Sequence, residues 1–372
     1  MPINLRKEEI MSEHDHIHLV LPGPVEVRRE ILDAQAEWMI GHRSKAFAEL
    51  FAHLQGNLRQ TFLTANRVFV STSSGSGLWE GASRNCVRDD QKVLHLVCGA
   101  FSDRWADVSR MNGKQVDVIS VDWGKAITPD MVADALRKDH YDAVAVVHNE
   151  TSTGVTNPLE DIAGVVSEAD NTLLLVDTVS GFLGAELRVD DWGIDVALTS
   201  SQKAFALPPG LSFAAVSDRA LERAKQVEFR GYYFDFLTFE KHLLKNNTPS
   251  TPPVSLLFAA DRQLDAIMDE GLEQRWKRHL AMRDRTIEWA QSRGFELYAQ
   301  EGYRSPTVTT VANNRGIDVV DLADFMLARG WAIDKGYGDI KGKTFRIPHM
   351  GDMTMDTLNA FLADIDAYLE QR

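Results

Sequence analysis

Short apolar runs rich in β-branched residues alternate with helical stretches through the first two thirds of the chain. Runs of this kind, nearly continuous in apolar residues, are typical of parallel strands with helices on both faces of the sheet. Helices are expected between them at 77–87, 102–112, 129–138 and 158–168. The pattern therefore predicts an α/β fold built on a mostly parallel central sheet. The expected strands are 67–72, 92–97, 116–122, 143–148, 172–177, 195–200 and 213–217.

The proline-rich stretch 248–255 interrupts the alternation of strands and helices. A proline disfavours helix in the residue before it, so this stretch predicts a break between elements. Beyond this stretch, amphipathic periodicity predicts a long helical region over 255–292 and a final helix over 354–370. Two strand-like runs, 307–312 and 343–348, are separated by a helical stretch and indicate a second, smaller α/β domain. We therefore expect three parts: an N-terminal arm over 1–20, a large domain over 21–255 and a small C-terminal domain over 256–372.

Composition and charge restrict the partners of the chain. Its 372 residues are 44% apolar and carry a net charge of −14, which argues against nucleic acid or an anionic membrane as the main partner. No apolar stretch reaches the roughly 18 residues that a membrane helix requires, and the first 18 residues lack the apolar segment of a signal peptide. The two cysteines, Cys86 and Cys98, fit a reducing compartment. We therefore expect a cytoplasmic protein that acts on small molecules, with no nucleic acid and no membrane.

Three alternating histidines, His14, His16 and His18, stand near the N-terminus. A metal site is one interpretation, since imidazole is a common metal ligand. Alternating histidines at a chain end are more typical of a polar, partly ordered arm, and we expect no metal there.

Lys203 is the only ionisable residue between Val196 and Ser217. Apolar surroundings lower the pKa of a lysine, and a neutral amine can attack a carbonyl and hold it as a Schiff base. Asp177 ends a strand-like run, where ligands of open α/β sheets bind. A Schiff-base lysine together with an acid for a ring nitrogen suggests pyridoxal 5′-phosphate. The alternatives are a lysine whose ammonium reaches water and an aspartate that caps a following helix.

Two polar loops follow predicted strands. In the stretch 71–85, Gly75 and Gly77 let backbone amides approach an anion at a helix N-terminus, and Ser76 adds a hydroxyl donor. Thr151, in the loop 149–155, offers a hydroxyl to a cofactor oxygen. Flexible turns without a ligand are the alternative for both loops.

Cationic residues occur in two further places. Arg346 lies inside a short apolar strand, where a guanidinium is costly unless it meets a carboxylate. It would clamp the carboxylate of an amino acid, or alternatively form a structural ion pair. His42 and Arg43 form a small basic site suited to a second anionic group on a substrate, or else mark the solvated start of a helix.

Taken in this order, the stretches resemble the class V aminotransferases of PLP fold type I. Within that class they are similar to the alanine–glyoxylate, serine–glyoxylate and serine–pyruvate group. The resemblance covers the chain from about residue 20 to residue 352 and implies the fold and cofactor of that class. The matching stretches are LPGP (21–24), SGSG (74–77), NETSTGV (149–155), VDTVSGFLG (176–184), SSQKAFALPPG (200–210), TPSTPPVS (248–255), SPTVTTV (305–311) and FRIPHMGD (345–352).

The resemblance implies a role for each matching residue. Lys203 would bind the cofactor covalently and move the substrate proton, Asp177 would bind the pyridinium nitrogen, and Arg346 would bind the substrate carboxylate. Thr251 would reach the cofactor phosphate across a homodimer interface, so that the dimer shares its active sites. The other cofactor contacts would come from Ser76, Gly77, Leu78, Phe101, Thr151, Val179 and Gln202. Relatives often carry Trp at the position of Phe101, and some carry His at that of Leu78, so one phosphate contact would be missing.

The implied reaction moves an amino group from a small L-amino acid, alanine or serine, to a 2-oxo acid such as glyoxylate or pyruvate. It would be ping-pong, through pyridoxamine phosphate. Phosphoserine aminotransferases use a similar His-Arg pair. His42 and Arg43 therefore leave phosphoserine or aspartate open as the amino donor, with 2-oxoglutarate and glutamate as the second pair of oxo acid and amino acid. A PLP-dependent lyase also stays open. A cysteine desulfurase is disfavoured because both cysteines precede Lys203, and a purely binding protein would not need Lys203, Asp177 and Arg346 together.

Overall fold

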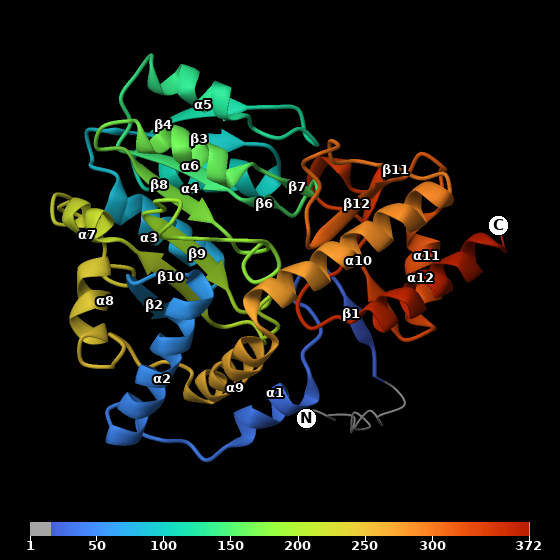
Figure 1. Cartoon of the computed structure of the whole chain (residues 1–372), viewed down its shortest axis with the longest axis horizontal. Coiled ribbons are helices and arrows are strands. Elements are labelled where there is room, and N and C mark those ends of the chain that lie inside the picture. Colours follow the sequence, from blue (N-terminus) through green and yellow to red (C-terminus); the bar gives the residue numbers. More distant parts are fainter. Residues whose placement is uncertain (1–15, 372) are drawn as a thin grey trace, which may run out of the picture.

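A computed structural model describes residues 16–371 and contains a central seven-stranded sheet (Figure 1). Strand β10 is antiparallel to both of its neighbours, and all other neighbouring strands pair in parallel. The predicted mostly parallel sheet is therefore confirmed. Its strand order is β2 (Arg67–Ser71), β10 (Ser212–Val216), β9 (Val196–Ser200), β8 (Leu173–Asp177), β5 (Ala143–Val147), β3 (Lys92–Val97) and β4 (Gln115–Ser120).

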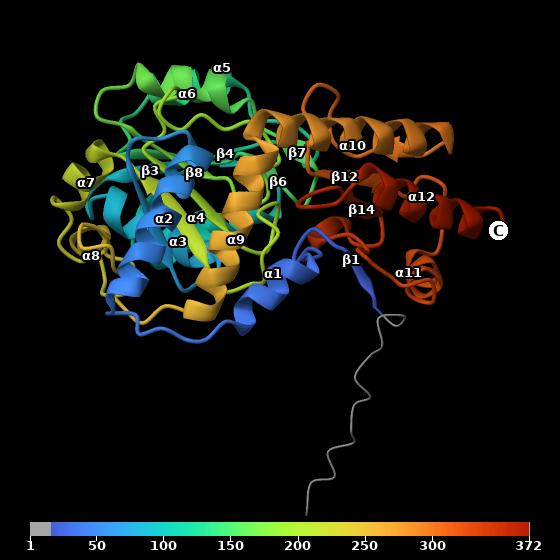
Figure 2. The ribbon, with the colours of Figure 1, turned by 60° about the horizontal axis from the view of Figure 1, so that its bottom comes forward.

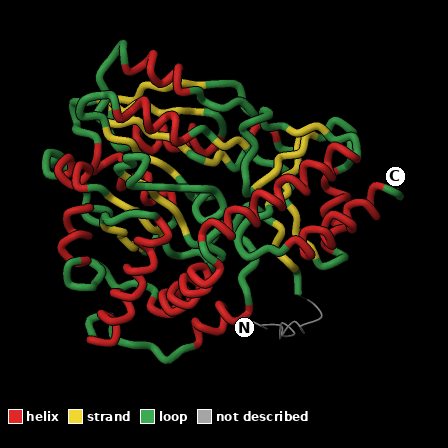
Figure 3. Tube along the Cα trace, viewed as in Figure 1, coloured by secondary structure: helices red, strands yellow, loops and turns green. Residues whose placement is uncertain are grey.

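Helices cover both faces of this sheet, and alternate residues of each strand point to opposite faces. In β5, Val144 and Val146 belong to one apolar core, whereas Ala145 and Val147 belong to the other. The tube view shows the strands enclosed between the helices (Figure 3). One face packs against α2 (Lys45–Phe62), α5 (Pro129–Leu136), α6 (Leu159–Ser167) and α9 (Val254–Glu270); the other packs against α3 (Gly75–Cys86), α4 (Ala100–Met111), α7 (Asp218–Ala224) and α8 (Phe236–Leu243).

The C-terminal part builds a separate small sheet, at the right of Figure 2. Its apolar core includes side chains of three helices, α10 (Leu272–Ser292), α11 (Val319–Leu327) and α12 (Met355–Leu369). Strand β1 (His18–Val20) pairs in parallel with β13 (Trp331–Ile333), so the start of the described chain joins this part. The antiparallel sheet consists of β11 (Glu296–Leu297), β12 (Val308–Ala312) and β14 (Thr344–Pro348); the remaining short elements are α1 (Arg29–Asp33), β6 (Asn149–Glu150) and β7 (Val155–Thr156).

The helical region predicted over 255–292 is two helices rather than one. Gly271, between α9 and α10, has a φ of 80°, a left-handed conformation that suits glycine and ends α9. Leu257 and Leu264 of α9 pack in the same core as the large sheet. Side-chain packing thus crosses residue 255, and the division into an arm and two domains stays a prediction.

Two of the three histidines near the N-terminus, His16 and His18, lie within the described residues. His14 is outside the described residues, His16 Nε2 lies 2.9 Å from Glu26 Oε1, and the His18 ring lies 5.1 Å from that of Trp331. The expectation of no metal stays a prediction, because His16, His18 and Glu26 bring ligand atoms within 4.8 Å of one another. In the described part of the chain, no helix combines the length and the apolar character needed to cross a membrane.

Candidate active site

A cavity of about 140 Å³ lies at the carboxyl ends of β5, β8 and β9, as expected for an open α/β sheet. Eight residues predicted from the sequence line it together: Gly75, Ser76, Phe101, Thr151, Asp177, Val179, Gln202 and Lys203. They come from segments up to 128 residues apart (75 to 203), so the fold creates this cluster. The lining also includes Trp79, Asn149, Ser180 and Ser200, which the sequence did not single out.

Lys203 lies half-buried three residues beyond β9, and its Nζ donates to the carbonyl oxygen of Pro22. A Cβ on Gly23 would lie 2.5 Å from Lys203 Cδ, so this glycine makes room for the lysine stem. Burial, and after it the guanidinium of Arg346, lower the pKa of Lys203 to about 8, although Asp177 and Asp334 oppose the shift. A neutral amine is therefore accessible near neutral pH.

Asp177 ends β8 and accepts hydrogen bonds from Val179 N and from Trp79 Nε1, each at 2.6 Å. Burial raises the pKa of Asp177 to about 7, although these two hydrogen bonds work against the shift. Residues 179–184 form turns, so Asp177 does not cap a helix. A cationic ring nitrogen placed beside this carboxyl group would favour its ionised form.

The glycine-rich loop lies at the N-terminus of α3, where backbone N–H groups favour an anion. A Cβ on Gly75 would lie 2.6 Å from Val179 Cγ2, so the loop approaches the cavity wall only because it carries glycine. Ser200 and Gln202 each hold a buried polar side-chain atom that has no partner among the described residues. A phosphate at this point would accept a hydrogen bond from the Ser200 hydroxyl, whereas Gln202 would have to donate through its amide NH2 group, because its Oε1 is itself an acceptor.

Two predicted neighbours of this loop do not line the cavity. The Leu78 side chain is 1% exposed and packs in the apolar core behind the sheet. A Cβ on Gly77 would meet the Phe234 ring at 2.6 Å. Cofactor contacts from these two residues, which would involve their backbone, stay predictions.

Thr151 and Phe101 are both held by neighbouring groups. Thr151 Oγ1 donates to Ser180 Oγ at 2.7 Å, and Ser180 Oγ donates to the Asn149 carbonyl oxygen at 2.8 Å. The Phe101 ring is stacked on Tyr337, with centroids 5.1 Å apart. These contacts fix the hydroxyl and the ring at the cavity wall.

Arg346 lies on β14 and is 5% exposed. Its Nη1 donates to the carbonyl oxygen of Thr151 at 3.0 Å, and Thr151 lines the cavity. Its Nε and Nη2 donate to the two carboxylate oxygens of Asp334, each at 2.7 Å. The ion pair considered as an alternative is therefore present, with Asp334 as the partner.

His42, Arg43 and Thr251 lie together but do not line the cavity of their own chain. Thr251 Oγ1 is 3.4 Å from His42 Nε2, and Arg43 donates to Asn247 Oδ1 and to the Thr248 carbonyl oxygen. Helix α2 begins at Lys45, just beyond this pair, as the alternative of a helix start requires, and a substrate contact from His42 and Arg43 stays a prediction.

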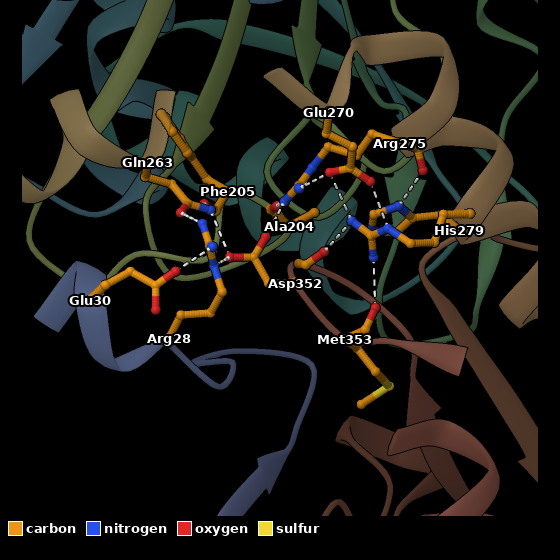
Figure 4. Close-up of polar contacts among 12 residues, drawn as sticks. Arg28, Glu30, Ala204, Phe205, Gln263, Glu270, Arg275, His279, Asp352 and Met353 are labelled. Atoms are coloured by element: carbon orange, nitrogen blue, oxygen red, sulfur yellow. Dashed lines mark hydrogen bonds and ion pairs between the residues drawn. The ribbon is translucent and has the colours of Figure 1, made fainter. Parts of the chain in front are cut away.

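The loop that follows Lys203 is held by a polar network centred on Asp352 (Figure 4). Arg275 Nη2 donates to the Ala204 carbonyl oxygen and to Asp352 Oδ1, each at 2.9 Å. Gln263 Nε2 donates to the Phe205 carbonyl oxygen at 3.0 Å and to Asp352 Oδ2 at 2.9 Å. Asp352 thereby joins the C-terminal part to the backbone beside Lys203.

We expect Asp352→Asn to lower the free energy of unfolding by about 3 kcal/mol, because Arg275 is 2% exposed and would lose a buried anionic partner. Although burial opposes it, the guanidinium of Arg275 lowers the pKa of Asp352 below its usual range. The stabilisation is thus present above the usual carboxyl pKa and is lost as the pH falls below it. Urea unfolding at pH 7 and pH 3 measures both effects, with the exposed Asp324→Asn as the control. Equal stability of the two variants at pH 7 would contradict this role.

A lysine that lines a cavity, an acid at a strand end and an anion-binding helix N-terminus are the groups that a pyridoxal-phosphate enzyme of fold type I requires. The sequence profile of the family "Aminotransferase class-V" matches residues 32–340. An uncharacterized aminotransferase of Methanocaldococcus jannaschii is 37% identical over 357 residues, which is 95% of this chain and 92% of that protein. The serine–glyoxylate aminotransferase of Arabidopsis thaliana is 32% identical over 95% of this chain and 90% of its own length.

Among solved structures, the alanine–glyoxylate aminotransferase of Nostoc sp. superposes with a TM-score of 0.91 at 29% identity, covering 99% of this chain and 100% of that chain. The chain belongs to the class V aminotransferases. It is a transaminase, and its cofactor is pyridoxal 5′-phosphate.

The pKa of Lys203 gives its reactivity a pH dependence near neutrality. Because the neutral amine is the nucleophile, the rate at which cofactor-free protein reacts with added pyridoxal 5′-phosphate should rise with pH and reach half its maximum near pH 8. Absorbance of the bound cofactor, recorded after mixing from pH 6 to pH 10, measures this rate. A midpoint near the usual lysine value of 10.5 would show that Lys203 is solvated.

Proposed function

We propose that the protein transfers an amino group from alanine or serine to a small 2-oxo acid such as glyoxylate or pyruvate. The observation that carries this proposal is the convergence of Lys203, Asp177 and Arg346 around one buried region. The Arabidopsis and Nostoc relatives are glyoxylate aminotransferases, which supports glyoxylate as the acceptor.

Each residue would have a distinct task. When bound, pyridoxal 5′-phosphate supplies a carbonyl for the amine and an electron sink for the carbanion. Lys203 would remove the proton from the substrate Cα and donate a proton to the cofactor carbon on the other side of the amino nitrogen, since its pKa near 8 lets it both accept and donate. Asp177 would keep the ring nitrogen protonated, and Arg346 would orient the substrate through its carboxylate. Phe101 and Val179 would pack against the ring.

Cofactor phosphate contacts are proposed for Ser76, Gln202 and the N-terminus of α3, with Ser200 added from the structure. Thr251, which lies outside its own cavity, would complete the phosphate site of a partner subunit in a homodimer. The homodimer and the cytoplasmic location both stay predictions. Sedimentation with bound cofactor, compared between the wild type and Thr251→Val, would test the shared site.

The contacts of Arg43 favour a donor without a second anionic group. Its guanidinium already donates to Asn247 Oδ1 and to the carbonyl oxygens of Thr248 at 2.8 Å and Pro249 at 3.3 Å. These bonds commit Arg43 to holding the segment that carries Thr251. Phosphoserine or aspartate as the donor, with 2-oxoglutarate as the acceptor, is therefore the second proposal.

The test is to add alanine, serine, phosphoserine, aspartate or glutamate singly to the purified enzyme and record its visible spectrum. Transamination predicts loss of the cofactor's visible absorbance with one equivalent of 2-oxo acid per site, and recovery of the absorbance on adding glyoxylate. Release of ammonia or of a cleaved product would favour a lyase instead. A protein that takes up no pyridoxal 5′-phosphate would contradict the proposal altogether.

A further inference from the structure

We propose that Asp334 is a positioning residue that fixes Arg346, so that only the outer edge of the guanidinium is presented to the substrate carboxylate. This inference rests on the proposed function, because it assumes that Arg346 binds that carboxylate. It adds a second residue, remote from the sequence motifs, to the recognition of the substrate.

The argument starts from the five N–H groups that a guanidinium carries. Nε and Nη2 of Arg346 each donate to one oxygen of Asp334 at 2.7 Å, and Nη1 donates to the Thr151 carbonyl oxygen at 3.0 Å. Among the described residues, no acceptor meets the two N–H groups that are left. One of them belongs to Nη1 and the other to Nη2, which is the pair that can hold a carboxylate in a bidentate manner.

The face of the guanidinium is restrained as well as its edge. The Arg346 Cζ atom lies 5.2 Å from the centre of the Tyr337 ring, which itself is stacked on Phe101. Arg104 Nη2 donates to the Tyr337 hydroxyl at 2.7 Å and holds this ring from its outer side. Asp334 and Tyr337 belong to one short segment, which therefore contacts Arg346 along one edge and across one face.

Burial makes the bidentate contact significant. The side chains of Arg346 and Asp334 are only 5% and 17% exposed, so water screens their interaction weakly. Without Asp334, Arg346 would keep its charge but lose the contact that defines its direction. Its positive charge would also act on Lys203 without the opposing carboxylate.

The opposite role for Asp334 would be competition, in which it occupies Arg346 until a substrate carboxylate displaces it. The two roles predict changes of opposite sign. Removal of a competitor lowers the substrate concentration needed for half-saturation, whereas removal of a positioning residue raises it.

The experiment compares Asp334→Asn with Asp339→Asn, a matched change at an exposed aspartate of the same segment. In single turnovers with the donor that the wild type accepts, Asp334→Asn should raise the half-saturating concentration by about tenfold or more. The rate at saturation should stay within about threefold, because the reacting atoms are unchanged. Inhibition by propionate, which has the carboxylate of alanine but no amine, should weaken by the same factor. The Asp339→Asn variant should match the wild type in all three measurements.

A second variant, Asp334→Glu, keeps the charge and should recover part of the loss; it also serves if Asp334→Asn fails to retain the cofactor. An unchanged or lower half-saturating concentration in Asp334→Asn would overturn the inference while leaving the proposed function intact. If the wild type converts no amino acid to its 2-oxo acid, the proposed function itself fails. Propionate inhibition would then have no substrate to compete with.

Discussion

Replacing Lys203 by alanine should lower turnover by at least about 10⁴-fold, the scale seen when a covalent nucleophile is removed. The side chain is half-buried, its pKa is lowered to about 8, and within the described part of the chain no other lysine lines the cavity. The variant loses both the amine that holds the cofactor and the base that moves the substrate proton. Oxo-acid release with saturating donor and added pyridoxal 5′-phosphate measures the effect.

The matched control is Lys277→Ala, because Lys277 is exposed on α10. It should retain wild-type activity. Activity of Lys203→Ala with added cofactor and no exogenous amine would contradict the assignment. A small amine such as ethylamine should restore a measurable part of the rate, since it can replace the lost base without the backbone connection.

Asp177→Asn should reduce turnover by about 10²–10³-fold, the scale associated with loss of one preorganised electrostatic group. Asparagine has the same shape as aspartate and can still accept a hydrogen bond from Trp79 Nε1, which donates to Asp177 at 2.6 Å in the wild type. It cannot carry the negative charge that a protonated ring nitrogen requires. The loss should therefore fall on the rate at saturating substrate, measured in single turnovers, rather than on donor binding.

The pH dependence of cofactor binding gives a second measurement of the same residue. Because burial raises the pKa of Asp177 to about 7, the cavity without cofactor holds a neutral carboxyl group below that pH. Affinity for the cofactor should fall as the pH decreases through 7 in the wild type and stay flat in Asp177→Asn. Trp79→Phe, which removes only the indole N–H, should reduce turnover far less, by about tenfold. Turnover of Asp177→Asn within about tenfold of the wild type would contradict the assigned role.

Much of the fold could be predicted because its signals are local in the sequence. A buried parallel strand needs apolar side chains on both faces, so the central strands β5, β8 and β9 are short, largely apolar runs. Lys203 stands out for the same reason, as a single charge in an apolar stretch. Asp177 ends β8 and Thr151 lies four residues beyond the end of β5, and the carboxyl ends of these two neighbouring parallel strands meet at one edge of the sheet.

Contacts between distant segments have no such local signal. Trp79 is 98 residues from Asp177, and its indole N–H reaches the carboxylate only because α3 packs beside β8. Leu78 and Ser76 are two residues apart on α3, yet one packs in the core and the other lines the cavity, because the helix presents them to different sides. The break at Gly271 between α9 and α10 likewise depends on a backbone conformation rather than on periodicity.

By itself, the sequence determined the α/β class, the strands of the central sheet, the lysine and the strand-end acid, because burial and strand alternation are properties of neighbouring residues. Only the tertiary structure decided what each charged group faces. In the folded chain Arg346 pairs with Asp334, and Asp352 is linked through Arg275 to the backbone beside Lys203. His42, Arg43 and Thr251 lie together outside the cavity of their own chain. The physical reason is that a buried charge is defined by its partner, and these partners arrive from other elements when the sheets and helices pack.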